Sequence, residues 1–190
     1  MQAILFVSFG GRMVNRSKKV VISARIEPRL KAALDIAASK LDEKIVKVLE
    51  DFVEEGLNGI FVEKNPFGGG LMPSNSQINF MEVFDAVWDE DEVLFKLRAG
   101  TIGAEFCGET LARQAQVVIS SDYFKGEYDL FGDLNGYTAI WGGEIEKRFV
   151  DLALVRKEWR YIEDYAAFMR VNDLVDLPYD YYKKMKGYGD

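Results

Sequence analysis

Residues 18–26, KKVVISARI, alternate between apolar and polar side chains, which is the period of a half-buried β-strand. The alternation predicts a strand over about residues 19–26. One face of it would carry Val20, Ile22, Ala24 and Ile26, and the other Lys19, Val21, Ser23 and Arg25. No second strand follows closely in the sequence, so this strand has no neighbour with which to pair.

After Pro28 the apolar residues change to helical spacing. Proline suits the first turn of a helix, and the apolar positions that follow are Leu30, Leu34, Ala37 and Leu41. A second helix is predicted to begin at Asp42, a good N-cap, and to end at Gly56. Its apolar positions are Ile45, Val48, Leu49, Phe52 and Val53. Each helix is amphipathic, so each needs a surface against which to pack.

Residues 61–77 interrupt this periodic pattern. The stretch EKNPFGGGLMPSNSQ contains three successive glycines, two prolines and several small polar residues, a composition typical of a linker. We therefore expect four parts: an N-terminal extension (1–17), a strand-helix-helix module (18–60), the linker (61–77) and a C-terminal domain (78–190).

The C-terminal domain mixes helical and strand-like patterns, so the predicted fold class is α+β. Helices are predicted over 78–88, 103–116 and 145–169, and strands over 92–98, 117–121 and 137–141. The apolar stripe of the last helix consists of Ile145, Phe149, Leu152, Val155, Trp159, Ile162, Ala166 and Met169. The alternative is a helix broken near Leu152, because FVDLALV also suits a strand.

The chain has no histidine and one cysteine, which limits the kinds of catalytic and metal site that it could contain. Without histidine the Ser-His-Asp and Cys-His nucleophile systems and the usual His-containing zinc sites are excluded. The single cysteine, Cys107, cannot form an internal disulfide, which fits a reducing compartment, so we expect a cytoplasmic protein. No catalytic residues, metal site or cofactor motif stand out, and a binding protein is favoured over an enzyme.

The net charge of −7 is unevenly distributed. Residues 1–60 carry ten Lys/Arg against eight Asp/Glu, whereas residues 61–190 carry fourteen against twenty-three. The acidic C-terminal part would repel nucleic acid phosphates, but the N-terminal part need not. No apolar run approaches the roughly 20 residues that a membrane span needs, so no membrane partner is expected. The two parts of the chain are thus predicted to have different partners.

A lone strand leaves unpaired backbone groups along both edges, and roughly 45 residues bury too little apolar surface to fold alone. Both deficits vanish if two copies pair their strands antiparallel and interlock their four helices. The segment VVISARIEPRLKAALDIAASKLDEKIVKVLEDFVEEG, residues 20–56, resembles the ribbon-helix-helix family, which includes the Arc and methionine repressors and many antitoxins. The resemblance covers about a fifth of the chain, and the C-terminal domain resembles no family. It implies a homodimer with contacts through Val20, Ile22, Ile26, Leu34, Ile45 and Phe52.

In that family the paired strands enter the major groove of DNA. The resemblance implies base reading by Lys19, Ser23 and Arg25, and phosphate contacts by Arg12, Arg16, Lys18 and Lys19. Two departures weigh against DNA binding. Asp42 and Glu43 occupy the corner that often grips a phosphate, and Val21 occupies an outward position suited to a polar side chain. The alternatives are a module that only dimerises, and a strand-helix-helix that is part of one larger domain.

Other motifs are interpreted as structural. WDEDEV (88–93) holds four adjacent acids, which rarely converge on one cation, so a solvated turn is expected. DLNGYTAIWGGE (133–144) departs from the calcium-loop template at Tyr137 and Thr138, and a turn leading to a strand is expected there. FGGGL lacks the Lys-Ser/Thr of a phosphate-binding loop. Cys107 has no activating neighbour, which indicates a buried thiol.

The leading hypothesis is a dimeric ribbon-helix-helix DNA-binding transcriptional regulator with a C-terminal domain that binds a protein partner or a ligand. The alternative is a protein-interaction inhibitor encoded by a mobile element or phage, antitoxin-like or anti-defence. Such an inhibitor would use the module only to dimerise and would dock its acidic, aromatic-rich C-terminal surface onto another protein.

Overall fold

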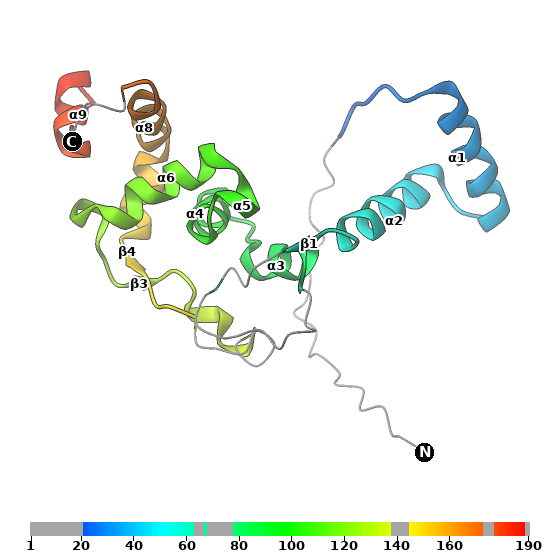
Figure 1. The fold of residues 1–190 in the computed structure, drawn as a ribbon, viewed down its shortest axis with the longest axis horizontal. Coiled ribbons are helices and arrows are strands. Elements are labelled where there is room, and N and C mark those ends of the chain that lie inside the picture. The colour runs from blue at the N-terminus through cyan, green and yellow to red at the C-terminus, as the bar shows by residue number, and fades with distance from the viewer. Residues whose placement is uncertain (1–20, 63–66, 68–77, 138–144, 173–176, 189–190) are drawn as a thin grey trace, which may run out of the picture. The chain divides into compact units, whose positions relative to one another are not determined.

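The computed structural model describes residues 21–62, 67, 78–137, 145–172 and 177–188 (Figure 1). The chain divides into two compact units, residues 1–50 and residues 51–190. The described parts are mostly helical, with two short antiparallel sheets of two strands each, which agrees with a coarse α+β class. No helix among them combines the length and the apolar character needed to cross a membrane. The predicted linker lies mostly outside the described residues.

The first unit contains helix α1, Pro28–Leu41, and the start of helix α2, Ile45–Asn58. The predicted start at Pro28 is confirmed. Asp42, however, does not cap α2: it ends α1 in the left-handed conformation, with φ 52°, where its backbone N–H donates to the Ser39 carbonyl oxygen and that of Glu43 to the Ala38 carbonyl oxygen. Aspartate is one of the few non-glycine residues that tolerate this conformation. Helix α2 also continues through Gly56 to Asn58, so the predicted stop at Gly56 is wrong.

Residues 21–27 precede α1 without regular secondary structure, and their side chains are exposed. The strand predicted over 19–26 is therefore not formed by the single chain over its described part, residues 21–26. The remaining two residues, Lys19 and Val20, lie outside the described residues. A strand in this segment requires a partner copy and stays a prediction.

Short strands connect distant parts of the second unit. Strands β1, Phe61–Val62, and β2, Ile78–Asn79, pair antiparallel. Strands β3, Tyr128–Asp129, and β4, Phe149–Val150, pair in the same way. The helices are α3 (Phe80–Val87), α4 (Glu92–Ile102), α5 (Ala104–Cys107), α6 (Glu109–Ser120), α8 (Leu152–Val171) and α9 (Tyr179–Lys186), with 3-10 helices η1 (Asp122–Phe124) and η2 (Gly132–Tyr137). The predicted helix over 78–88 is confirmed as α3.

Two predicted strands are helical in the structure. Residues 92–98 belong to α4, because the Asp91 side chain accepts from the backbone N–H groups of Val93 and Leu94 and so caps a helix. The buried residues of α4 are Leu94, Leu97, Arg98, Ala99 and Gly100, which lie on several sides of the helix and so obscure its period. Residues 117–120 are the last turn of α6 rather than the start of a strand.

Two predicted helices have different limits. The helix expected over 103–116 is divided at Gly108, which has a positive φ of 83° that favours glycine. The last helix begins at Leu152, where Asp151 accepts from the backbone N–H of Leu154, and not at Ile145. The alternative of a helix broken near Leu152 is correct in placing a boundary there, but the residues before it are irregular or belong to strand β4 and not to a helix. The predicted strand over 137–141 lies outside the described residues except for Tyr137, which ends η2.

Helices α4, α6 and α8 pack against one another and supply much of the core. Their best-buried apolar residues include Leu97, Val118, Val155 and Ile162. Gly100 of α4 lies directly against α6. A Cβ added there would be 2.5 Å from the Leu111 carbonyl oxygen and 2.6 Å from the Ala115 Cβ. The close crossing of α4 and α6 therefore depends on this glycine.

Gly100→Ala should lower the free energy of unfolding by about 1–3 kcal/mol, because the added methyl group overpacks the crossing of the two helices. Chemical denaturation of the full chain measures this change. Gly56→Ala is the matched control, because nothing lies within 4 Å of its Cβ position and alanine favours a helix interior. Equal stability of Gly100→Ala and the wild type would contradict the close crossing.

Candidate functional site

The N-terminal unit leaves most of its apolar side chains exposed. Among the described residues 21–50, only Ala38 and Val48 are buried. The exposed large apolar residues are Val21, Ile22, Ile26, Leu30, Ile36, Leu41, Val46 and Leu49, and Phe52 and Val53 follow along α2. Ile22 is 86% exposed and Phe52 is 52% exposed. The described residues 21–53 thus expose many large apolar side chains, which is typical of a surface that binds a partner.

The predicted contact residues are only partly brought together. Of the dimer contacts, Leu34 and Ile45 are half-buried, and Ile22, Ile26 and Phe52 are exposed. Of the DNA contacts, Ser23 and Arg25 are exposed in the segment before α1. The other predicted residues, which lie outside the described part of the chain, are Arg12, Arg16, Lys18, Lys19 and Val20.

The turn between α1 and α2 carries charges of both signs. A shallow hollow there is lined by Ala38, Ser39, Asp42, Glu43, Lys44 and Lys47. The two carboxylates would repel a phosphate and the two ammonium groups would attract it. The first turn of α2 contains no acidic residue. The acidic pair therefore precedes the helix N-terminus instead of occupying its first turn.

The second unit contains a buried polar cluster centred on Glu158 of α8. The Lys183 ammonium group donates to Glu158 Oε1 at 2.5 Å and to the Tyr123 hydroxyl oxygen at 2.9 Å. The hydroxyl of Tyr179 donates to Glu158 Oε2 at 2.9 Å, and that of Tyr123 to Oε1 at 2.9 Å. Lys183 is 5% exposed and Glu158 2%. This cluster fastens α9 and η1 to α8.

The pKa values of Lys183 and Tyr179 follow from their hydrogen bonds and their burial in this cluster. Burial lowers the pKa of Lys183, but the hydrogen bonds to Glu158 and Tyr123 outweigh it and raise the pKa overall. Burial, with the hydrogen bond to the Glu158 carboxylate, raises the pKa of Tyr179 well above its ordinary value. Lys183 therefore stays charged and Tyr179 stays neutral. The Glu158 carboxylate accepts from three donors, which hold it in place between α8, α9 and η1.

A second buried charge, Arg98 of α4, connects two loops. Its Nε donates to the Leu130 carbonyl oxygen at 2.8 Å, and its Nη2 to Asp133 Oδ1 at 2.7 Å. Its Nη1 lies 3.8 Å from Asp89 Oδ2. Asp91, from the same acidic run as Asp89, caps α4 and also pairs with Arg156 at 2.5 Å. Two acids of the run that was expected to form a solvated turn, Asp89 and Asp91, are thus ion-paired with arginines.

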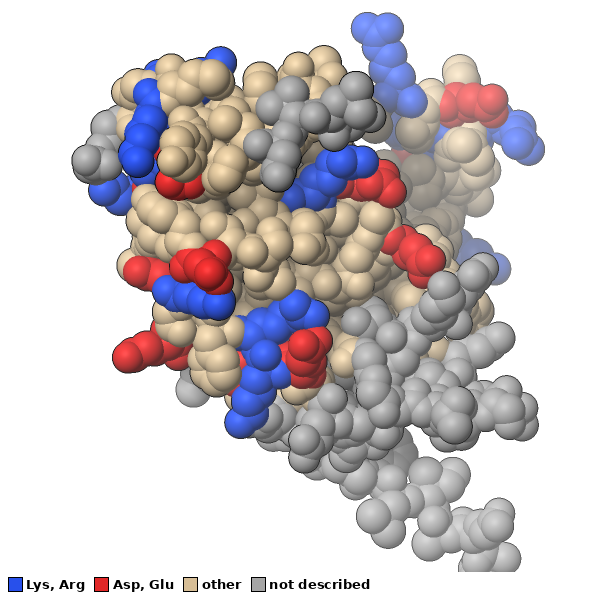
Figure 2. Space-filling model, turned by 60° about the vertical axis from the view of Figure 1, so that its left-hand side comes forward, with Lys and Arg blue, Asp and Glu red and all other residues tan. Residues whose placement is uncertain are grey.

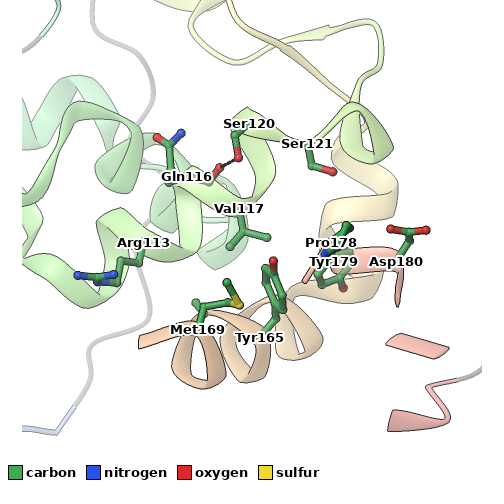
Figure 3. Close-up of a pocket in the computed structure, with 11 residues that line it drawn as sticks. Arg113, Gln116, Val117, Ser120, Ser121, Tyr165, Met169, Pro178, Tyr179 and Asp180 are labelled. Carbon is green, nitrogen blue, oxygen red and sulfur yellow. Dashed lines mark hydrogen bonds between the residues drawn. The ribbon is translucent and has the colours of Figure 1, made fainter. Parts of the chain in front are cut away.

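A groove of about 470 Å³ lies between α6, α8 and the start of α9 (Figure 3). Helix α6 contributes Arg113, Gln116, Val117 and Ser120, at helical spacing along one face. The remaining lining residues are Ser121, Tyr165, Ala166, Met169, Pro178, Tyr179 and Asp180. Figure 3 shows Arg113 and Asp180 at opposite ends, with Val117, Tyr165 and Met169 between them. The groove thus joins an apolar middle to two charged ends.

An aromatic stripe follows one side of α3: Phe80, Phe84 and Trp88, four residues apart. The Phe84 ring stacks on both of the others, with centroids 6.0 Å and 5.6 Å away. Phe95 of α4 packs edge-on against Phe84 and Trp88 at 5.6 Å and 5.1 Å. Trp88 is 47% exposed. Trp88 is therefore the exposed end of the stripe, whereas Phe80 and Phe84 are half-buried.

Sequence reasoning missed Glu158, Lys183 and the groove. Glu158 follows Val155 by three residues and precedes Ile162 by four, so it lies on the buried stripe of α8, and that position was the available signal. Of the aromatic residues of the C-terminal domain, Trp159, Tyr179 and Tyr182 are buried. Tyr181, by contrast, is exposed.

Neither metal nor thiol chemistry is indicated. In the described parts of the chain, no group of three His, Cys, Asp or Glu residues could hold a metal ion. Burial raises the pKa of Cys107, whose thiol donates to the Gly103 carbonyl oxygen at 3.3 Å, so a reactive thiolate is disfavoured.

Comparisons with protein-family models, curated proteins and solved structures found no match.

Proposed function

We propose that the protein is a homodimeric DNA-binding transcriptional regulator of ribbon-helix-helix type, whose C-terminal domain binds a second partner. The observation that carries the proposal is the uncovered apolar surface of residues 21–53. Two amphipathic helices follow a short segment whose alternating apolar residues are also exposed. A second copy of the same segment supplies both a strand partner and a complementary apolar surface.

The energetic reason for pairing is the small core of this region. Fully burying a Val, Leu, Ile or Phe side chain contributes about 1.5–3 kcal/mol. Ile22, Ile26, Leu49 and Phe52 all have much of this burial still to gain. A dimer gains it twice over, once from each chain. Because the surface lies on both the segment and the helices, an interlocked dimer covers it better than pairing of the strands alone.

Arg25 is the residue through which DNA binding is tested. It is exposed in the segment before α1, as a base-reading residue on a paired strand would have to be before binding. Arg25→Ala should weaken binding to operator-like DNA by about 1–3 kcal/mol, measured by fluorescence anisotropy at low salt. Arg160→Ala, an exposed arginine of α8, is the matched control and should leave the affinity unchanged. No binding beyond a nonspecific level, or equal binding by Arg25→Ala, counts against this function.

The second candidate is the protein-interaction inhibitor, antitoxin-like or anti-defence, and the aromatic stripe of α3 favours it. Exposed aromatic side chains are enriched at protein interfaces. Asp85 lies on the same helix, and burial, followed by the nearby Glu54 carboxylate, raises its pKa, so two acidic side chains lie near each other here. A cationic group from a partner would relieve the repulsion between them.

The charges on the C-terminal unit do not resemble the continuous negative charge of a nucleic acid. Figure 2 brings part of the C-terminal unit forward and shows acidic and basic side chains next to one another around a broad uncharged area. The acids on this face do not form a continuous patch. A protein partner that binds the full chain, and is lost with Trp88→Ala but kept with Arg25→Ala, would favour the interaction protein over the regulator.

A further inference from the structure

The groove between α6, α8 and α9 has one end suited to an anion. Arg113 is exposed, and its Nε is as far as 3.8 Å from the nearest carboxylate oxygen, on Glu109. Beyond Arg113 the groove adjoins a hollow of about 90 Å³, which Arg170 also lines. No partner of Arg170 is found in the described parts of the chain. Two guanidinium groups with weak or no internal pairing therefore border one end.

The acidic residue at that end is already engaged. Glu163 lines the smaller hollow with the two arginines. Its Oε1 accepts from Trp159 Nε1 at 2.9 Å and lies 3.5 Å from the Lys96 ammonium group. Among the described residues, Glu163 thus pairs with Trp159 and Lys96 and with neither arginine.

The middle of the groove offers apolar surface. Val117, Ala166 and Met169 line it, together with Tyr165 and Tyr179. The hydroxyl groups of these tyrosines are committed elsewhere: Tyr165 donates to the Leu177 carbonyl oxygen at 2.5 Å, and Tyr179 donates to Glu158. Tyr179 is 4% exposed, so a ligand would mainly meet the half-buried Val117, Tyr165 and Met169. An aromatic or aliphatic body fits this surface.

The far end sets the length and the polarity of the ligand. Arg113 and Ser120 are seven residues apart on α6, which corresponds to about 10 Å along the helix. Asp180 lines the far end, so a second anionic group would be repelled there. Ser121 Oγ accepts from the Tyr123 backbone N–H, which leaves its hydroxyl hydrogen free to donate to a neutral polar group.

We propose that this groove binds a small organic molecule with a single anionic group. Its carboxylate or phosphate lies at Arg113 and Arg170, and its apolar body, up to about 10 Å long, lies along Val117 and Met169. The site lies wholly within residues 51–190. The inference gives a ligand class to the C-terminal domain of the proposed regulator, but it does not require that the chain bind DNA.

Titration of the full chain with 4-phenylbutyrate and with phenyl phosphate, followed by amide chemical shifts in NMR, tests the site. We expect saturable shifts in α6, α8 and α9 from at least one probe, and the tighter probe identifies the preferred anionic group. Arg113→Met should weaken binding about tenfold, since it removes a charge-assisted hydrogen bond. The neutral analogue 4-phenylbutyramide should lose a comparable factor.

Arg160→Met is the matched control, because Arg160 is an exposed arginine of α8 that does not line the groove. It should bind the probes as the wild type does. Absence of saturable shifts with both probes up to about 10 mM, or equal binding by Arg113→Met, overturns the inference. DNA affinity measured on the same Arg113→Met protein separates the two proposals. If this variant loses probe binding but keeps DNA binding, the result supports the groove independently of the regulator. If no variant binds DNA, the result counts only against the regulator.

Discussion

Replacing Lys183 by methionine will lower the free energy of unfolding by about 3–5 kcal/mol. Methionine keeps an unbranched side chain but removes the ammonium group, which leaves the Glu158 carboxylate buried without its cation. The two tyrosine hydroxyls that remain donate hydrogen bonds but carry no positive charge. A buried charge without compensation is costly, so the cost is far larger than for an exposed pair. Urea denaturation followed by circular dichroism measures it.

Lys184→Met provides the control, since Lys184 is the exposed neighbour of Lys183 on α9 and undergoes the same chemical change. Its effect should stay within about 0.5 kcal/mol. Combining Lys183→Met with Glu158→Gln should restore part of the loss, because neither residue then leaves a buried charge. A Lys183→Met protein as stable as the wild type would show that α9 is not held on α8 by this pair.

Arg98→Met will lower the free energy of unfolding by about 3 kcal/mol, through loss of two hydrogen bonds made by a charged donor. One acceptor is the backbone carbonyl oxygen of Leu130, a fully buried residue. The other is the Asp133 carboxylate. Without Arg98 the loop around these two residues loses its connection to α4. Thermal and chemical denaturation should agree on the change.

Arg98→Lys tests the geometry of the guanidinium group. Lysine keeps the charge but cannot present two donors in a fixed fork, so only a minor part of the stability should return. Arg160→Met, which removes the charge of an exposed arginine in the same unit, should change the free energy of unfolding by less than about 0.5 kcal/mol. A nearly full rescue by Arg98→Lys would mean that charge, and not the fork, holds the loop.

The start of a helix can be predicted from the sequence where it depends on a single residue. Pro28 begins α1 because its fixed backbone angle suits a first turn, whatever surrounds it. Residues 92–98 were misassigned because seven alternating residues fit a buried helix face as well as a strand, and the cap at Asp91 decided for the helix. Asp42 could either cap a helix or end one, and the sequence alone does not choose between them.

The buried charges depend on partners far away along the chain. Arg98 bonds to residues 32 and 35 positions away, and Lys183 to a residue 25 positions away. No local pattern brings such residues together. The groove likewise depends on the packing of α6, α8 and α9. The ligand site that we propose for the C-terminal domain could therefore be found only from the three-dimensional structure.

Association of two copies through residues 18–56 underlies both the regulator and the interaction-protein proposals. The molar mass of the full chain in solution, measured by light scattering after size exclusion at micromolar concentration, tests it most directly. We predict twice the chain mass of 21.6 kDa, and a shift towards the single-chain mass when Ile22 is replaced by aspartate. A wild-type mass of 21.6 kDa at every concentration would contradict the dimer.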